Sequence, residues 1–116
     1  MRYDDTGIAA ICHEAIRGLQ IAQDSLNPSD PWTAAPAWQK TMTIEGVQRA
    51  RRIVTPRDHH EAWREVMMMD GWTWGPQQDW ERKTHPNMLP YGDLPPAERD
   101  KDELFLLIVT WAVGKG

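Results

Sequence analysis

The stretch Thr55–Gly71, TPRDHHEAWREVMMMDG, carries the clearest start and stop signals for a helix in this chain. A threonine hydroxyl can cap the first turn, and Pro56 suits the first helical position because the N–H that it lacks would be unbonded there. Asp58 places a negative charge at the positive end of the helix dipole. Gly71 tolerates the left-handed conformation that often follows a helix. The stretch therefore predicts a helix that begins after Thr55 and ends at Gly71.

The segment that follows, from Trp72 to Pro90, has no regular period of either strand or helix type. Glycines and prolines interrupt it repeatedly. A long irregular segment in a small domain is typically functional or disordered, and the rings of Trp72, Trp74 and Trp80 favour order. We expect an ordered aromatic loop that packs on the helices.

Two helices are expected before Thr55, separated by a proline-rich linker. The first is capped by Asp5 or Thr6, and its apolar residues recur at steps of three and four, which predicts a core face of Ile8, Ile11, Cys12, Ala15, Leu19 and Ala22. The second runs from about Pro36 to Ile53, with Trp38, Met42, Val47 and Ala50 facing inward.

The last element begins near Pro95 and Pro96 and continues through AERDKDELFLLIVTWAV to Gly114. We expect a polar helical start and then a buried helix whose inward residues are Leu104, Leu107, Ile108 and Trp111. No alternating strand pattern competes with these helices. The fold class predicted is all-α: a single domain over residues 1–116, with four or five helices and one long ordered aromatic loop.

Composition limits the function classes. A chain of 116 residues with a net charge of -4 suits one hydrophobic core, and its basic residues are spread out, so nucleic-acid binding is not expected. No run approaches the roughly 18 apolar residues of a membrane span, and the start MRYDDTG does not resemble a secretory signal, so we expect a cytoplasmic protein without a membrane partner. The single cysteine, Cys12, lies among apolar residues and is expected in the core rather than as a nucleophile.

Four blocks of sequence resemble the RyR domain, the repeat domain of ryanodine receptors. They are HEAW at 60–63, GWTWGP at 71–76, KTHPNMLPY at 83–91 and LPPAERDKD at 94–102, in the family's order and spacing. The block ICHEAIRGLQ at 11–20 further resembles the stand-alone RyR-domain proteins of bacteria and their phages. Trp74 stands where the family usually has tyrosine, and Ile16 where the stand-alone forms usually have asparagine.

The resemblance implies a compact helical domain that binds a small molecule. Channel repeats are associated with adenine nucleotides, and the bacterial and phage members resemble sensors or sequestering proteins for nucleotide-derived immune signals. Two repeats pair in the channels, which implies that a lone copy can form a homodimer. No cofactor is implied.

The candidate ligand-binding residues are rings and donors in and near the aromatic loop. Stacking of a base on aromatic rings, together with basic side chains for an anion, would capture a nucleotide. From an extended backbone we expect Trp72 and Trp74 to share a face. The rings could equally form core, and His85 could simply hold its turn. The full set of candidates is Trp63, Trp72, Trp74, Lys83, His85, Tyr91, His13 and Arg17.

Other constellations point away from catalysis. His59 and His60 are adjacent, so on a helix they diverge by about 100° and do not favour one metal; we expect no metal site. The run at 49–52, RARR, is interpreted as complementing a helix dipole, with phosphate contact as the alternative. No catalytic triad, phosphate loop or paired-carboxylate pattern is present, so we expect no enzyme. Two functions remain: binding of a nucleotide-derived ligand, or a structural module that dimerises or binds a protein through its aromatic loop.

Overall fold

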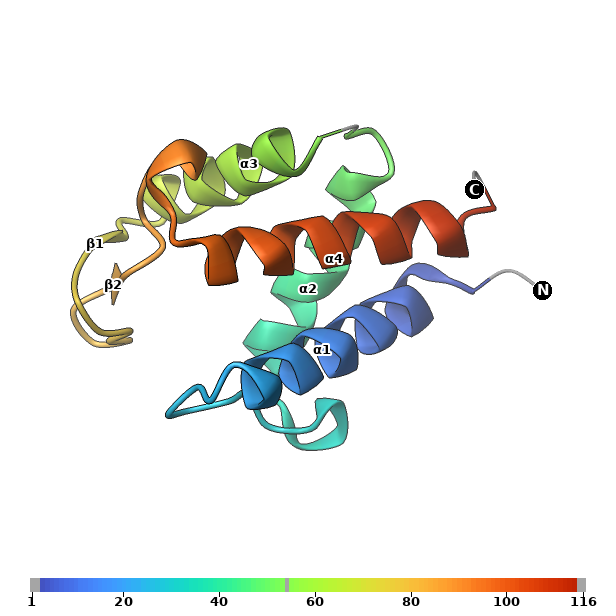
Figure 1. Ribbon diagram of the computed structural model, residues 1–116, viewed down its shortest axis with the longest axis horizontal. Helices are drawn as coiled ribbons and strands as arrows, with labels where there is room; N and C mark the ends of the chain where they lie inside the picture. Colours follow the sequence, from blue (N-terminus) through green and yellow to red (C-terminus); the bar gives the residue numbers. More distant parts are fainter. Residues whose placement is uncertain (1–2, 54, 115–116) are drawn as a thin grey trace.

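Four α-helices form the computed structural model, which describes residues 3–53 and 55–114 (Figure 1). They are α1 (Asp5–Ala22), α2 (Ala37–Ala50), α3 (Pro56–Met69) and α4 (Pro96–Ala112). Short 3-10 turns precede α2 (η1, Trp32–Ala34) and α4 (η2, Tyr91–Asp93). The all-α prediction is confirmed, with one addition: the aromatic loop contains two-residue strands β1 (Thr73–Trp74) and β2 (Thr84–His85), paired in parallel.

The helices contact one another around a shared centre. α1 and α4 run antiparallel side by side, α2 crosses behind them, and α3 lies against the first half of α4 (Figure 1). The loop with β1 and β2 lies at the far end of α3 and returns through η2 into α4. No helix in the described part of the chain is both long enough and apolar enough to cross a membrane.

Local sequence signals set the helix ends. The Thr55 hydroxyl accepts a hydrogen bond from the Asp58 N–H at 3.1 Å, and Gly71 has φ +90°, so the predicted start and stop of α3 are both confirmed. The cap of α1 is Asp4, whose carboxylate accepts from the Gly7 N–H at 2.7 Å, one residue before the expected cap. The second helix is shorter at both ends than the expected span from 36 to 53.

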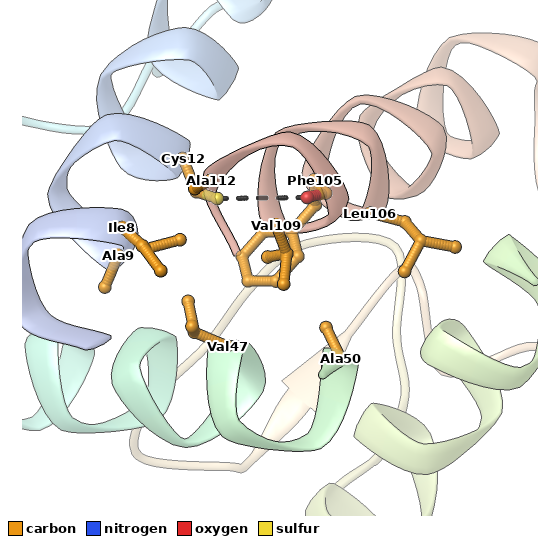
Figure 2. Close-up of a cluster of buried hydrophobic side chains, with 9 residues drawn as sticks. All are labelled: Ile8, Ala9, Cys12, Val47, Ala50, Phe105, Leu106, Val109 and Ala112. Atoms are coloured by element: carbon orange, nitrogen blue, oxygen red, sulfur yellow. Dashed lines mark hydrogen bonds between the residues drawn. The ribbon is translucent and has the colours of Figure 1, made fainter. Parts of the chain in front are cut away.

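The main core lies where α1, α2 and α4 meet. Figure 2 shows side chains from the three helices converging on one another: Ile8, Ala9, Cys12, Val47, Ala50, Phe105, Leu106, Val109 and Ala112. The Cys12 thiol lies 3.9 Å from the Phe105 carbonyl oxygen, and burial raises its pKa to about 12. This thiol stays protonated near neutral pH, as expected for a core residue rather than a nucleophile.

The inward face of the last helix is rotated by roughly 140° from the expected one, although Ile108 still packs against the main core as expected. Leu107 is 66% exposed and Trp111 is 60% exposed, whereas Leu106 and Val109 are buried. The run LFLLIVTWAV is apolar on every side, so its period does not indicate which face meets the neighbouring helices. Two further residues expected inside are exposed, Trp38 and Ala22.

A second, smaller core anchors the aromatic loop. Met67, Trp72 and Met88 are buried together, and Met42 and Trp63 pack against them. Gly75 permits the close approach of the loop's two strands, since a Cβ there would lie 2.6 Å from the Thr84 Cβ. The loop is thereby held against α2 and α3, where the candidate site lies.

Candidate functional site

Two neighbouring pockets lie between the helices and the aromatic loop. The first, here called the aromatic pocket, has a volume of about 250 Å³ and receives residues from α1, α2, α3 and the loop. Its lining consists of His13, Ile16, Gln20, Ser29, Trp38, Gln39, Met42, Trp63, Met67, Gln78, Trp80 and His85. Rings and amide side chains dominate this surface, and none of these side chains carries a fixed charge.

The second pocket, here called the polar pocket, has a volume of about 210 Å³ and lies between α2, α3 and α4. It is lined by Met42, Thr43, Gly46, Arg49, His59, His60, Trp63, His85, Asn87, Glu98, Lys101, Asp102 and Phe105. Met42, Trp63 and His85 line both pockets, which makes the two cavities neighbours across a shared wall.

Aromatic contacts position the rings of the aromatic pocket. The centroids of Trp38, on the first turn of α2, and Trp80, in the loop, are 3.8 Å apart. Trp80 also meets the edge of buried Trp72 at 4.8 Å. These contacts between three rings fix the loop to α2. The side chains of Trp38 and Trp80 remain 43% and 44% exposed.

His85 occupies the wall between the pockets in its neutral form. Burial is the main cause that lowers its pKa to about 4, with Lys101 and His60 adding to the effect and Glu98 opposing it. Its Nδ1 accepts a hydrogen bond from the Asn87 N–H at 2.9 Å, so the neutral ring carries its proton on Nε2. That Nε2–H makes no hydrogen bond with the described residues and is a donor available to a ligand.

Hydrogen bonds from the HEAW block tie the chain before α4 onto α3. The His60 Nε2–H donates to the Leu89 carbonyl at 2.7 Å, and the Glu61 carboxylate accepts from the Tyr91 N–H at 2.8 Å. Hydrogen bonding to Tyr91 and Arg64 outweighs partial burial and lowers the pKa of Glu61. These residues hold the site together, and Trp63, on the same helix, forms its wall.

The structure brings together three of the candidates chosen from sequence. His13, Trp63 and His85 line the aromatic pocket. His13 also donates from Nε2 to the Asp30 carbonyl at 2.6 Å, and Arg17 donates from Nε to the Ser29 carbonyl at 3.0 Å, so both hold the proline-rich linker. Arg17 itself lies outside both pockets.

The remaining candidates lie outside both pockets. Trp72 is 4% exposed whereas Trp74 is 54% exposed, so the expected shared face is not formed; the paired, extended backbone begins only at Thr73. The Lys83 ammonium donates to the Asp70 carbonyl at 2.7 Å and lies 3.4 Å from its carboxylate. Tyr91 carries the Arg57 guanidinium over its ring at 5.3 Å.

Sequence reasoning missed most of the polar pocket. For the run that contains Arg49 the sequence favours a helix dipole, with phosphate contact as the alternative; Arg49 follows Met42 by seven residues and so lies on the same helical face, a signal that could have placed it in the pocket. His59 was considered only as a metal ligand. In the described part of the chain no group of three or more His, Cys, Asp or Glu side chains is placed to hold a metal ion.

Comparison with known proteins agrees with the motifs. A search of curated proteins found no match. The family model of the RyR domain matches residues 36–106, which contain α2, α3, the aromatic loop and the first half of α4, and exclude α1. This match covers more than half of the chain and includes most of both pockets, and the chain therefore belongs to the RyR domain family.

Proposed function

We propose that this RyR domain is a non-enzymatic, cytoplasmic domain that binds a nucleotide-derived small molecule, with the base held in the aromatic pocket. The supporting observation is the lining of that pocket. Trp38, Trp63 and Trp80 line it with aromatic rings, and its glutamines supply both donors and acceptors. Proteins bind unstacked bases by this combination of aromatic stacking and hydrogen bonds to the base edge.

The size of the pocket suits part of such a ligand. At about 250 Å³ it is slightly smaller than the ~300–1,000 Å³ of sites that enclose drug-sized molecules. A single ring system therefore fits inside, and the rest of the ligand extends beyond it. The stand-alone members that the sequence resembles look like sensors or sequestering proteins for nucleotide-derived immune signals, and sequestration or sensing of such a signal is the role that we propose here.

A ligand panel tests the proposal. Tryptophan fluorescence and thermal shift are measured against adenine nucleotides, ADP-ribose derivatives and cyclic nucleotides. A true ligand raises the melting temperature progressively with its concentration. Trp38→Ala should weaken binding by ~1–3 kcal/mol, the usual contribution of one stacked base.

Trp111→Ala is the matched control, because Trp111 is exposed on α4 and lies outside both pockets. It should leave the affinity unchanged. Absence of any response across the panel, or equal losses in both variants, would contradict the proposal.

A second candidate function is a module that binds another copy of the chain through the aromatic loop. It is supported by two large apolar side chains on the surface: Trp74 in the loop is 54% exposed, and Met69 at the end of α3 is 83% exposed. Sedimentation velocity of the wild type and of Trp74→Ala separates the two functions. A dimer that Trp74→Ala dissociates, with no ligand response, would favour this module; a monomeric wild type would exclude self-association.

A further inference from the structure

Arg49 lines the polar pocket with a guanidinium whose hydrogen-bonding capacity is not filled by the described residues. It lies near the end of α2, and it makes no hydrogen bond or ion pair with any residue that the structure describes. Its Nε is buried and unbonded. Burial lowers the pKa of its guanidinium, and the charge of Glu45 opposes that effect. Because arginine has only donors, this Nε–H requires an acceptor from elsewhere.

His59 presents a second unbonded nitrogen in the same pocket. Its side chain is 8% exposed, its Nδ1 is buried without a partner, and its ring stacks on Phe105 at 4.5 Å. Burial, followed by the charges of Arg49 and His60, lowers the pKa of His59 to about 4. The imidazole is therefore neutral at pH 7, and it can carry its proton on Nδ1 and act as a donor.

The acidic groups of the pocket are already engaged or weakly charged. The Glu98 carboxylate accepts from the Lys101 ammonium at 2.6 Å and from the Asn87 amide at 2.8 Å. The Asp102 carboxylate lies 3.6 Å from the Nδ1 of His60, and burial, reinforced by Glu98, raises its pKa to about 7. Among the charged side chains that line the pocket, Arg49 is the one that makes neither a hydrogen bond nor an ion pair with a described residue.

We propose that the polar pocket is a subsite for an oxyanion, a phosphate or carboxylate group of the ligand, with Arg49 Nε–H and His59 Nδ1–H as its donors. Arginine and an additional N–H donor are a common arrangement for binding these groups. The subsite adjoins the aromatic pocket across Met42, Trp63 and His85, and the proposal is that one molecule spans these side chains, with its ring in one pocket and its anion in the other. In that respect the inference rests on the proposed function.

This assignment replaces Lys83 as the source of the anion contact. Lys83 is held by Asp70 and lies outside both pockets. In contrast, Arg49 Nε and His59 Nδ1 have no hydrogen-bond partner among the described residues. The distinction is testable because the two basic residues lie on different elements.

The experiment compares ligands that differ in one anionic group. Calorimetry measures the affinity of the full chain for adenosine, for adenosine 5′-monophosphate and for adenosine 5′-carboxylic acid. The wild type should bind one of the two anions at least tenfold more tightly than adenosine, and the larger gain identifies phosphate or carboxylate as the preferred group.

Arg49→Met should abolish that gain and leave the affinity for adenosine unchanged. His59→Phe, which keeps a ring on Phe105, should reduce the gain, and Arg49→Lys should restore only part of it. Arg52→Met, which removes an equal charge from the same basic run, and Lys83→Ala should both preserve the gain. Circular dichroism checks that each variant is folded. If Arg49→Met does not fold, His59→Phe tests the subsite in its place.

The outcomes separate the subsite from the proposed function. If adenosine binds but neither anion adds affinity, or if Arg49→Met keeps the gain, the subsite is wrong and the nucleotide-binding function stands. If none of the three compounds binds, the ligand panel decides the nucleotide function, and inorganic phosphate tests the subsite alone. A phosphate-dependent rise in melting temperature that Arg49→Met removes would support it, and no rise would overturn it.

Discussion

Individual residues in the aromatic loop differ sharply in what surrounds them. Trp72 belongs to the smaller core, Trp74 is exposed, and Trp80 lines the aromatic pocket. Their sequence neighbours are similar, so the difference arises from the second core and from the pairing of β1 with β2. Large rings in one short segment therefore serve as core, surface and pocket wall at once.

Gly75 offers the most direct test of the loop's packing. Gly75→Ala would place a Cβ 2.6 Å from the Thr84 Cβ, closer than real Cβ contacts, so the two strands must separate. Overpacking of this kind costs ~1–3 kcal/mol. Urea unfolding should show that loss of stability.

Gly18→Ala is the control for the glycine substitution. Gly18 lies in α1 with open space around its Cβ position, and alanine in a helix interior is favoured over glycine by ~0.5–1 kcal/mol. This variant should be more stable than the wild type. Equal stabilities of Gly75→Ala and wild type would show that the strands do not pair as described.

His59 should make folding stability depend on pH. Burial, with the charges of Arg49 and His60, lowers its pKa from 6.5 to about 4. Between these pH values the His59 imidazole is protonated in the unfolded chain and neutral in the native protein. The stability that depends on the neutral ring is fully present above pH 6.5 and is lost as the pH falls towards 4. The loss is roughly 3 kcal/mol at most.

The measurement compares His59→Phe with the wild type by urea unfolding at pH 7, 6, 5 and 4. As the pH falls, the free energy of unfolding of the wild type should decrease relative to that of His59→Phe. A comparison of two proteins is needed because Asp102, whose pKa is raised to about 7, has the opposite sign: its native state holds a proton that the unfolded state releases. A difference that stays constant with pH would contradict the assignment of His59 as a buried neutral ring.

At the scale of elements, the helix ends follow from local signals and the helix faces do not. The Thr55 cap and the left-handed Gly71 involve only neighbouring residues, which is why the bounds of α3 could be predicted. The orientation of α4 depends on α1 and α2, which pack against one side of a helix that is apolar all round.

A pair of adjacent leucines tests that orientation. Leu106 is 7% exposed within the main core and Leu107 is 66% exposed. Leu106→Ala should cost ~2–5 kcal/mol because it leaves a cavity, whereas Leu107→Ala should change stability by less than ~0.5 kcal/mol. Thermal and urea unfolding of the two variants provide the comparison. Equal costs, or the reverse order, would mean that α4 is rotated from the position described.

At the scale of the whole molecule, α1 completes both the core and the site. Ile8, Ala9 and Cys12 are fully buried against α2 and α4, and His13, Ile16 and Gln20 form one side of the aromatic pocket. All of these residues precede the region that matches the RyR family model.

A chain of residues 36–116, which lacks α1, should therefore not fold cooperatively. The loss of α1 exposes the apolar faces of α2 and α4 that α1 covers. We expect reduced near-ultraviolet circular dichroism, binding of a hydrophobic dye and a broad thermal transition. A sharp transition near the melting temperature of the full chain would show instead that the family region is an independent folding unit.

The sequence by itself determined the all-α class, the start and stop of α3 and, through four spaced motifs, membership of the RyR family. These features depend on local capping, backbone preference and composition, which are properties of neighbouring residues. Only the tertiary structure decided that Trp72 is core, that Leu106 rather than Leu107 faces inward, and that Arg49 and His59 line one pocket, each with a buried, unbonded nitrogen. Each of these depends on which helix covers which face, because burial and desolvation are set by contacts between segments that lie far apart in the chain.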